Sequence, residues 1–364
     1  MSRRRVAGRG AVLVATMAIA TGCGPSEAPI SDVVDLIPTL TRIATLGCGD
    51  CDGPDALAVV SVEVYQERVV VRDKYEPLVR IFDLGGGAPQ TFGVLGEGPG
   101  EFGPIELPIF ATSDARLFAY ELEAMHEYSS AGEHLAAFDW PMRLPIGHYF
   151  DTAGRLAVIS APPPYARRDR RDVEVIEYRP GADDFGPHVL VPADALPYAD
   201  DSGDRTLVST IGISPAGDIV LGDPIDYVIF WYDREGALLD RVVLERQPPS
   251  VPPMEQRRYE EWRRNLAVTD ELKSRNPHFV NSGFHFDDAG RLWVQTLRWS
   301  GAGDERTTTT FDVFDEQHEF VGSVEVPVAL TGNWPTTTIR RDLLAGSYID
   351  ADGHHRVAVW RIID

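Results

Sequence analysis

The sequence predicts an all-β fold made of six copies of a small antiparallel sheet. In each copy an apolar segment ends on an aromatic residue, and the copies follow one another at 46 to 54 residues except for one interval of 82: Phe82, Tyr128, Tyr178, Tyr232, Phe314 and Trp360. A turn rich in Asp, Ser and Gly precedes a strand upstream of most of these aromatics, most clearly at 151–158 and 287–294. A period near 50 residues with four short strands per unit is typical of a β-propeller, so we expect six four-stranded antiparallel blades.

The first 22 residues have the pattern of an export signal. Four arginines precede an apolar run at 11–20, which is shorter than the about 20 residues needed to cross a bilayer. Residues 20–23, Ala-Thr-Gly-Cys, resemble the bacterial lipobox, in which cleavage before the cysteine leaves Cys23 to carry the lipid. Residues 18–20 also satisfy the small-x-small rule of ordinary signal cleavage, so secretion without a lipid remains an alternative.

A polar tether at 23–37 leads into the propeller, which we place at 38–364. The last copy of the repeat stops at Asp364, directly after its third strand. Its fourth strand must come from elsewhere, because an unpaired edge would be left exposed. The strand-like segment Leu40–Leu46 has no blade of its own, so we expect it to supply this outer strand and to close the ring.

The three cysteines are an odd number for an exported chain. If Cys23 carries lipid, Cys48 and Cys51 remain to pair in an oxidising compartment, and we expect a small structural disulfide. A redox dithiol would need a helix N-terminus to lower the thiol pKa, whereas the loop residues 52–54 follow here. A zinc site would need a second pair of ligands.

The glycine-rich stretch 93–103 is predicted to be a tight crossover between two neighbouring sheets. Glycine tolerates positive φ and Pro99 fixes its own φ, which suits a sharp connection. A dinucleotide-binding fingerprint fails because Glu101 occupies the third glycine position and no helix pattern follows. A phosphate-binding loop fails because the Gly-Lys-Ser/Thr ending is missing.

The interval of 82 residues indicates an insertion, with helical character at about 252–276. Tyr259, Trp262 and Leu266 stand at i, i+3 and i+7, which predicts an amphipathic helix entered through prolines. Tyr259 and Trp262 would belong to a lid over one mouth of the propeller, or to a side helix packed on the blades. Long insertions serve either role, and the two interpretations remain open.

The net charge of −22 argues against binding to nucleic acid, whose affinity rests on Lys and Arg neutralising phosphates. It also argues against an anionic membrane surface as an electrostatic partner. The membrane contact that we expect is therefore the N-terminal lipid alone. An acidic surface also keeps a soluble protein apart from its neighbours, and this plainer explanation is sufficient for the charge.

Ligands of propellers bind in or over the central channel, which the first strand of each blade lines. We expect these strands at Ala58–Tyr65, Leu107–Ala111, Ile146–Phe150, Leu207–Ile213, Phe279–Phe286 and Ala345–Ile349. Their polar members give the candidate ligand residues Glu63, His148, Asn281 and His285. Glu63 is the sole carboxylate in these strands, which makes a poor calcium site, so calcium stays an alternative and no metal is expected. No catalytic Gly-x-Ser-x-Gly or His-Glu-x-x-His motif is present, and no catalytic residue is assigned.

The turn-Gly-x-Leu-x-Val repeats, the Gly-x-Gly-Pro-Gly-Glu-Phe crossover and the lipobox together resemble the bacterial six-bladed β-propeller lipoproteins, which are related to NHL-repeat propellers. The resemblance covers residues 38–364 and implies an extracytoplasmic, lipid-anchored protein, but it transfers no catalytic residue. We therefore expect a module that binds an unknown protein or small molecule and is not an enzyme. A metal-dependent hydrolase or lactonase that uses the channel is the first alternative, and an envelope scaffold is the second.

Overall fold

A computed structural model describes residues 37–47, 57–96, 98, 100–103, 108–112, 115–120, 124–139, 145–150, 156–160, 173–178, 189–191, 210–247, 278–297, 307–331 and 336–364. Contacts between Cα atoms divide the chain into Met1–Val34 and Asp35–Asp364, and every described residue belongs to the second unit. All the described elements are β-strands. None of the described residues forms a helix that is long and apolar enough to cross a membrane.

The described strands form four-stranded antiparallel sheets, which we number in chain order. Sheets 1 and 2 contain β2 (Val59–Tyr65), β3 (Arg68–Asp73), β4 (Val79–Asp83), β5 (Gln90–Phe92), and β6 (Ile109–Ala111), β7 (Leu117–Tyr120), β8 (Ala124–Tyr128), β9 (His134–Asp139). Sheets 3 and 4 contain β10 (Pro145–Phe150), β11 (Leu156–Ser160), β12 (Val173–Tyr178), β13 (Val189–Val191), and β14 (Thr210–Ile213), β15 (Ile219–Asp223), β16 (Val228–Tyr232), β17 (Leu238–Val243). Sheet 5 contains β18 (Phe279–Phe286), β19 (Leu292–Thr296), β20 (Thr309–Phe314) and β21 (Phe320–Val326). Sheet 6 contains β22 (Thr337–Arg340), β23 (Leu343–Ile349), β24 (His355–Ile363) and β1 (Thr39–Leu46).

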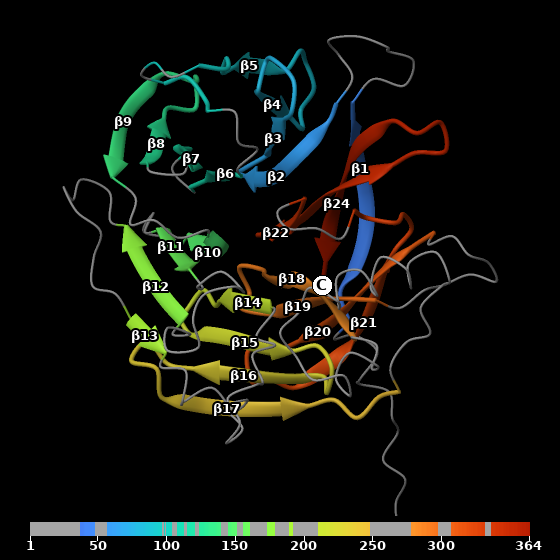
Figure 1. Ribbon diagram of the computed structural model, residues 1–364. Coiled ribbons are helices and arrows are strands. Elements are labelled where there is room, and N and C mark those ends of the chain that lie inside the picture. Colours follow the sequence, from blue (N-terminus) through green and yellow to red (C-terminus); the bar gives the residue numbers. More distant parts are fainter. Residues whose placement is uncertain are drawn as a thin grey trace, which may run out of the picture. The chain divides into compact units, whose positions relative to one another are not determined.

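The sheets stand side by side around a centre, with their first strands nearest to it (Figure 1). Contacts join β2 to β6 and to β22, and they also join the first strands along the run β10, β14, β18 and β22. Sheet 1 is apolar on both faces because a neighbour covers each face, and Val69, Val70 and Val71 of β3 are fully buried. Within residues 35–364 this is a β-propeller of four-stranded antiparallel blades.

Among the described side chains, apolar clusters lie between sheets 1 and 2, 4 and 5, 5 and 6, and 6 and 1. Val62 and Val64 of β2 pack against Leu343 and Val359 of sheet 6, whereas Tyr65 lies in the cluster with Ile109 and Leu117 of sheet 2. Side chains of β2 therefore alternate between the two neighbouring sheets, as the period of two in a strand requires. This alternation leaves few positions on the first strand for polar residues.

The repeated aromatic residues occupy equivalent places in the structure. Phe82, Tyr128, Tyr178, Tyr232, Phe314 and Trp360 all lie on the third strand of their sheets. Phe82, Tyr128, Phe314 and Trp360 belong to apolar clusters between neighbouring sheets, and Tyr128, Tyr232, Phe314 and Trp360 are at most 1% exposed. The repeat read from the sequence thus corresponds to one sheet per copy.

The N-terminal strand β1 lies beside the last strand of the chain. It pairs antiparallel with β24 from Thr39 opposite Ile363 to Leu46 opposite Val357, with a register shift between Arg42 and Ala44. The order of sheet 6 is therefore β1-β24-β23-β22, with β1 at its outer edge. The Arg42 guanidinium lies 5.9 Å from the centre of the Trp360 ring and donates to the Tyr348 hydroxyl at 2.9 Å.

Short capped turns join many strands as the Asp and Gly pattern predicts. Asp287 Oδ1 accepts hydrogen bonds from the backbone N–H groups of Ala289 and Arg291 at 3.1 and 2.9 Å, and Gly290 has φ of 81°. Asp233 and Gly236 repeat the arrangement in the turn between β16 and β17. The carboxylate satisfies backbone donors that the turn would otherwise leave without partners.

The prediction of the first strand of sheet 6 was wrong. The first strand is β22, and Ala345–Ile349 lies in β23, the second strand. Ser347 therefore does not belong to the channel-lining set. The sequence misled because β22 is four residues long and begins with two threonines, so it has no apolar run, whereas β23 is buried and apolar over most of its length.

The glycine-rich stretch 93–103 connects β5 to the segment before β6, and its glycines permit close packing. A Cβ on Gly93 would lie 2.7 Å from a ring carbon of Phe102, and a Cβ on Gly100 would lie 2.8 Å from Cβ of His134. Leu95 and Phe102 form a parallel bridge across the loop. The structure agrees with a compact crossover between sheet 1 and sheet 2.

Several expectations lie outside the described residues. These are the signal sequence and tether, Cys23, the Cys48 and Cys51 pair, and the helical insertion at about 252–276 with Tyr259 and Trp262. They stay predictions.

Candidate functional site

The first strands place the described polar side chains nearest to the central axis. Among the described first-strand residues, Glu63 is the sole carboxylate, and it is 2% exposed. Its Oε1 accepts a hydrogen bond from Thr338 Oγ1 of β22 at 3.1 Å and another from the backbone N–H of Val64 at 3.1 Å. Glu63 therefore joins sheet 1 to sheet 6, and its carboxylate is already engaged by protein donors.

Two further hydrogen bonds join the first strands of different sheets. The backbone N–H of Ile109 donates to Ser61 Oγ at 3.2 Å, which connects β6 to β2. Arg340, at the end of β22, donates through Nη1 to the backbone carbonyl of Ala111, at the end of β6. The strand β2 lies between β6 and β22, because it contacts both of them. Arg340 therefore reaches across one end of the central space.

The other three predicted ligand residues lie on first strands as expected. His148 is on β10 and is paired with Val158, and Asn281 is on β18. His285 is on β18, half-buried, with its ring 6.1 Å from the Phe311 ring in an edge-to-face arrangement. Phe311 belongs to the cluster between sheets 5 and 6, so His285 lies at that boundary. The structure brings Glu63 to Thr338 on β22, the strand that also carries Arg340.

The two ends of the strands differ in the connections that they carry. A first strand begins where the fourth strand of the preceding sheet ends, so first-to-second and third-to-fourth connections share one face of the propeller. None of the first-to-second connections exceeds five residues. The opposite face carries the second-to-third and fourth-to-first connections. These include the six longest connections of the propeller, which are 47–58, 93–108, 161–172, 192–209, 244–278 and 297–308. We call the first face the turn face and the second the loop face.

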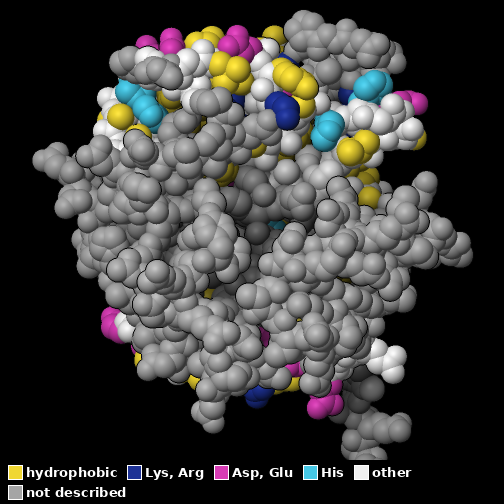
Figure 2. Space-filling view, viewed as in Figure 1, with side chains coloured by type: hydrophobic (Ala, Val, Ile, Leu, Met, Phe, Trp, Pro, Cys, Tyr) yellow, Lys and Arg dark blue, Asp and Glu magenta, His cyan; other side chains and the backbone are white. Residues whose placement is uncertain are grey.

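The surface seen in Figure 2 shows acidic, basic and apolar side chains intermixed over its described part. On the loop face of sheet 1, Tyr75, Val94 and Leu95 are 63%, 49% and 53% exposed. The Leu95 backbone N–H donates to Glu76 Oε1 at 2.8 Å, which holds residues 94–95 beside the connection between β3 and β4. These three side chains form an exposed apolar group that the structure fixes in place.

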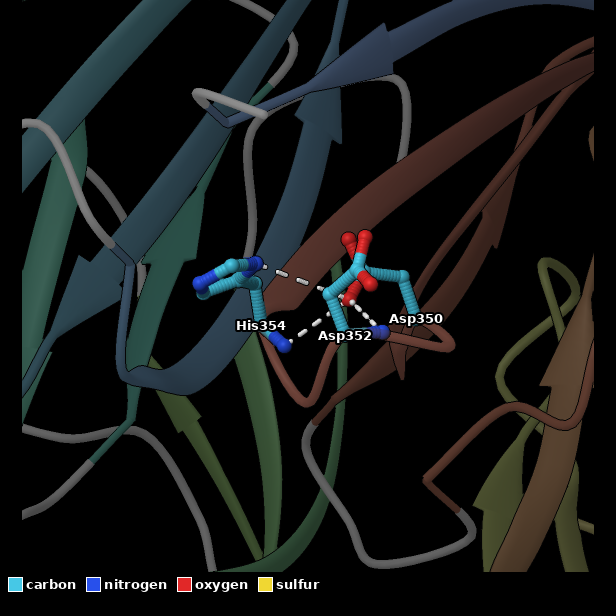
Figure 3. Close-up of side chains that lie close together, drawn as sticks. All are labelled: Asp350, Asp352 and His354. Carbon is cyan, nitrogen blue, oxygen red and sulfur yellow. Dashed lines mark hydrogen bonds and ion pairs between the residues drawn. The ribbon is translucent and has the colours of Figure 1, made fainter. Parts of the chain in front are cut away.

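A group of metal-ligand residue types lies in the turn between β23 and β24, also on the loop face (Figure 3). Asp350, Asp352 and His354 offer ligand atoms that all lie within 4.8 Å of one another. Asp350 Oδ1 accepts backbone hydrogen bonds from Asp352 at 3.1 Å and His354 at 2.9 Å, and Oδ2 accepts from Arg356 Nε at 2.8 Å. The pKa of Asp350 is lowered by the hydrogen bond from the His354 backbone, with further contributions from Arg356 and Asp352. Turn capping explains Asp350.

Sequence reasoning missed a buried polar network between sheets 4 and 5. The Tyr227 hydroxyl and Arg246 Nη1 both donate to Asp312 Oδ2, the latter at 2.7 Å, and Ser323 Oγ donates to Asp312 Oδ1 at 2.6 Å. Burial raises the pKa of Tyr227 well above its usual range, and the Asp312 carboxylate adds to the shift. Asp312 belongs to no sequence motif. The one available signal for a buried polar contact was a charged residue placed between apolar residues of a strand.

Comparisons with known proteins inform the fold. No protein-family profile matches the chain, and no curated protein matches it. An exported protein from Bacteroides fragilis is similar in structure, with 11% sequence identity and a TM-score of 0.50 over 89% of this chain and 95% of that one. A member of the DUF4221 family from Bacteroides vulgatus gives 10% identity and a TM-score of 0.50 over 90% and 99% of the two chains. At these identities the similarity shows the fold alone, and the chain is similar to these bacterial proteins in being built as a propeller.

Proposed function

We propose that this chain is an exported, lipid-anchored β-propeller that binds a protein or small-molecule ligand over the loop face and is not itself an enzyme. The observation that carries the proposal is the difference between the two faces. On the turn face the connections whose residues are described have at most six residues, whereas the loop face carries the longest connections and the exposed group of Tyr75, Val94 and Leu95. Binding residues concentrate on long connections that a rigid scaffold positions.

The described channel residues favour binding over metal-dependent hydrolysis. A divalent cation held for hydrolysis needs several convergent oxygen ligands. Glu63 is the sole carboxylate on the described part of the first strands, and it accepts hydrogen bonds from Thr338 and Val64. Arg340 lies across one end of the central space and adds a positive charge there, which opposes cation binding.

The ring is proposed to have six blades and to be closed by β1. Sheet 6 takes its outer strand from the N-terminal side and its other three from the C-terminal side, so the two ends of the propeller are joined by strand pairing. Such pairing covers the edge of β24, which would otherwise be exposed. The proposed kinship is with bacterial six-bladed propeller lipoproteins of the NHL-repeat type, on the crossover and repeats described above.

Export is proposed from the N-terminal signal pattern, with Cys23 as the lipid attachment site. The similar protein from Bacteroides fragilis is described as exported, which is compatible with this location. In that compartment Cys48 and Cys51 would form a disulfide.

The binding face can be tested by site-specific photo-crosslinking in the native host. A photo-reactive amino acid replaces Tyr75 on the loop face, and a matched variant carries it at Glu235, an exposed residue in the turn between β16 and β17 on the turn face. We expect discrete crosslinked products from position 75 and none from position 235, identified by mass spectrometry. Products from position 235 alone, or none from either position together with no bound small molecule in native mass spectrometry, would overturn the proposal.

A further inference from the structure

Two histidines of sheet 2 hold their ring nitrogens close together. His126 Nδ1 lies 3.1 Å from His134 Nε2, and the two rings are 5.3 Å apart between centroids. His126 is on β8 and His134 is the first residue of β9, the outer strand of the sheet. Both side chains are half-buried, so one side of the pair remains in contact with solvent. Figure 2 shows histidine side chains at the surface in the region of β8 and β9.

A register shift in the sheet brings the two rings together. Glu127 is opposite Ala136, but Tyr128 is opposite His134, so one residue of β9 is looped out between them. Without this bulge Tyr128 would face Leu135, and His134 would lie outside the ladder. With it, His126, Tyr128 and His134 share one face of the sheet, because side chains two apart on a strand point to the same side.

The surroundings hold both rings in place. The Tyr128 ring stands edge-on to the His134 ring at 5.4 Å, and Phe102 stacks on Tyr128 at 5.4 Å with an interplanar angle of 4°. The crossover passes directly over His134, because Gly100 at φ of 80° has no Cβ, and an added Cβ would come within 2.8 Å of His134 Cβ. A pair of rings that is positioned by packing loses little conformational freedom when it binds a ligand.

The separation of the nitrogens fits chelation of one metal ion. Imidazole nitrogen binds zinc at about 2.0–2.1 Å, so two such ligands in tetrahedral geometry lie about 3.3 Å apart, and in octahedral geometry about 2.9 Å apart. The observed 3.1 Å, over which the two rings share a hydrogen bond, lies between these values.

We propose that His126 and His134 form a binding site for a divalent transition metal of the copper, nickel or zinc type. The two imidazoles supply two ligands from adjacent strands, and water or a donor atom of a bound partner completes the coordination. Imidazole pairs prefer these ions to Mg²⁺ and Ca²⁺, which take oxygen ligands. The site lies beside the crossover 93–103, so metal binding would stiffen the junction of sheets 1 and 2.

The experiment measures thermal unfolding of the mature chain, stripped of metal, with and without Cu²⁺, Ni²⁺ or Zn²⁺. A ligand that binds only the native state raises Tm, and we expect a rise of about 2 °C or more at a metal concentration well above Kd, with none for Mg²⁺. The variants His126→Gln and His134→Gln should each bind the metal at least about tenfold more weakly by titration. Glutamine keeps a polar side chain of similar size, so both variants should fold. Their metal-free Tm, compared with that of the unchanged protein, checks this.

Two control variants separate this site from other ligands of the chain. One carries Asp352→Asn with His354→Gln, which removes two of the three members of the turn cluster, and the other carries Cys48→Ser with Cys51→Ser. The proposal expects both to keep the metal-induced rise in Tm, and expects copper electron paramagnetic resonance to show two nitrogen ligands that fall to one in His126→Gln. It is overturned if the metal gives no rise, if both glutamine variants keep the full rise, or if either control abolishes it.

Discussion

The network around Asp312 gives the sharpest test of how the sheets are held together. Tyr227 precedes β16 and Arg246 follows β17, so both belong to sheet 4, while Asp312 and Ser323 belong to β20 and β21 of sheet 5. Asp312 is completely buried and accepts hydrogen bonds from the other three. Removing the Tyr227 hydroxyl in Tyr227→Phe deletes a donor to a charged group, which costs about 1.5–3 kcal/mol.

Asp312→Ala should be the more damaging change. It leaves the Tyr227 hydroxyl and the Arg246 guanidinium without their shared acceptor, and breaking a buried pair of this kind costs about 3–5 kcal/mol. Because the Arg246 side chain is 23% exposed, we expect the lower end of this range. Since the residues share one network, the double variant should be less destabilised than the sum of the single changes, by about 0.5–3 kcal/mol.

The assay is urea unfolding followed by tryptophan fluorescence, with Tyr75→Phe as the matched control. Tyr75 is 63% exposed, so its hydroxyl should contribute within about 0.5 kcal/mol. A loss below about 0.5 kcal/mol in Tyr227→Phe, or strict additivity with Asp312→Ala, would refute the network. The raised pKa of Tyr227 adds a second readout: its stabilising contribution is complete below the unfolded value of about 10 and is lost as pH rises through the folded pKa. The fall in stability above pH 10 should therefore be shallower in Tyr227→Phe.

Deleting residues 38–46 removes the partner of β24 and should cause unfolding or aggregation, measured by thermal melting and light scattering; an unchanged Tm would contradict ring closure by β1. Cys23→Ser should release the protein from membranes in fractionation, and unaltered membrane association would reject lipid attachment at this residue. His318 Nδ1 donates to Asp240 Oδ2 at 2.9 Å and its ring stacks on Trp231 at 4.3 Å, so His318→Gln should lower stability by about 1 kcal/mol or less. The hydrogen bond from His318 lowers the pKa of Asp240. Its contribution to stability is therefore complete above the unfolded pKa of about 3.9 and is lost as the pH falls through the folded pKa. An identical acid-unfolding profile for His318→Gln would contradict this contribution.

The repeat could be recognised in the sequence because its turns and strand ends depend on residues that are close together in the chain. Asp287 and Gly290 mark a turn in any fold, since the carboxylate caps backbone donors and glycine accepts positive φ. An aromatic residue such as Phe314 at the end of an apolar strand marks the buried third strand. These signals recur in phase, so the sequence predicts small antiparallel sheets arranged as a propeller, and the structure shows that fold class.

The position of β22 could not be predicted from the sequence, because this strand depends on its neighbour and not on a local pattern. Thr337–Arg340 has no apolar run, and it is a strand because it pairs with Leu343–Gly346 beside it. The prediction took the stronger apolar segment at 345–349, which is part of the second strand, as the first strand. A short edge strand is stabilised by its neighbour more than by its own composition.

The sequence by itself determined the repeat, its turns and the acidic surface, because each of these depends on residues that are adjacent in the chain. The tertiary structure alone decided which distant residues meet. Glu63 receives its hydrogen bond from Thr338, 275 positions away, and the Asp312 network gathers four residues from two sheets. His126 and His134 face each other because of one looped-out residue in β9. Strand register and the packing of one sheet on another are cooperative, so no local pattern specifies them.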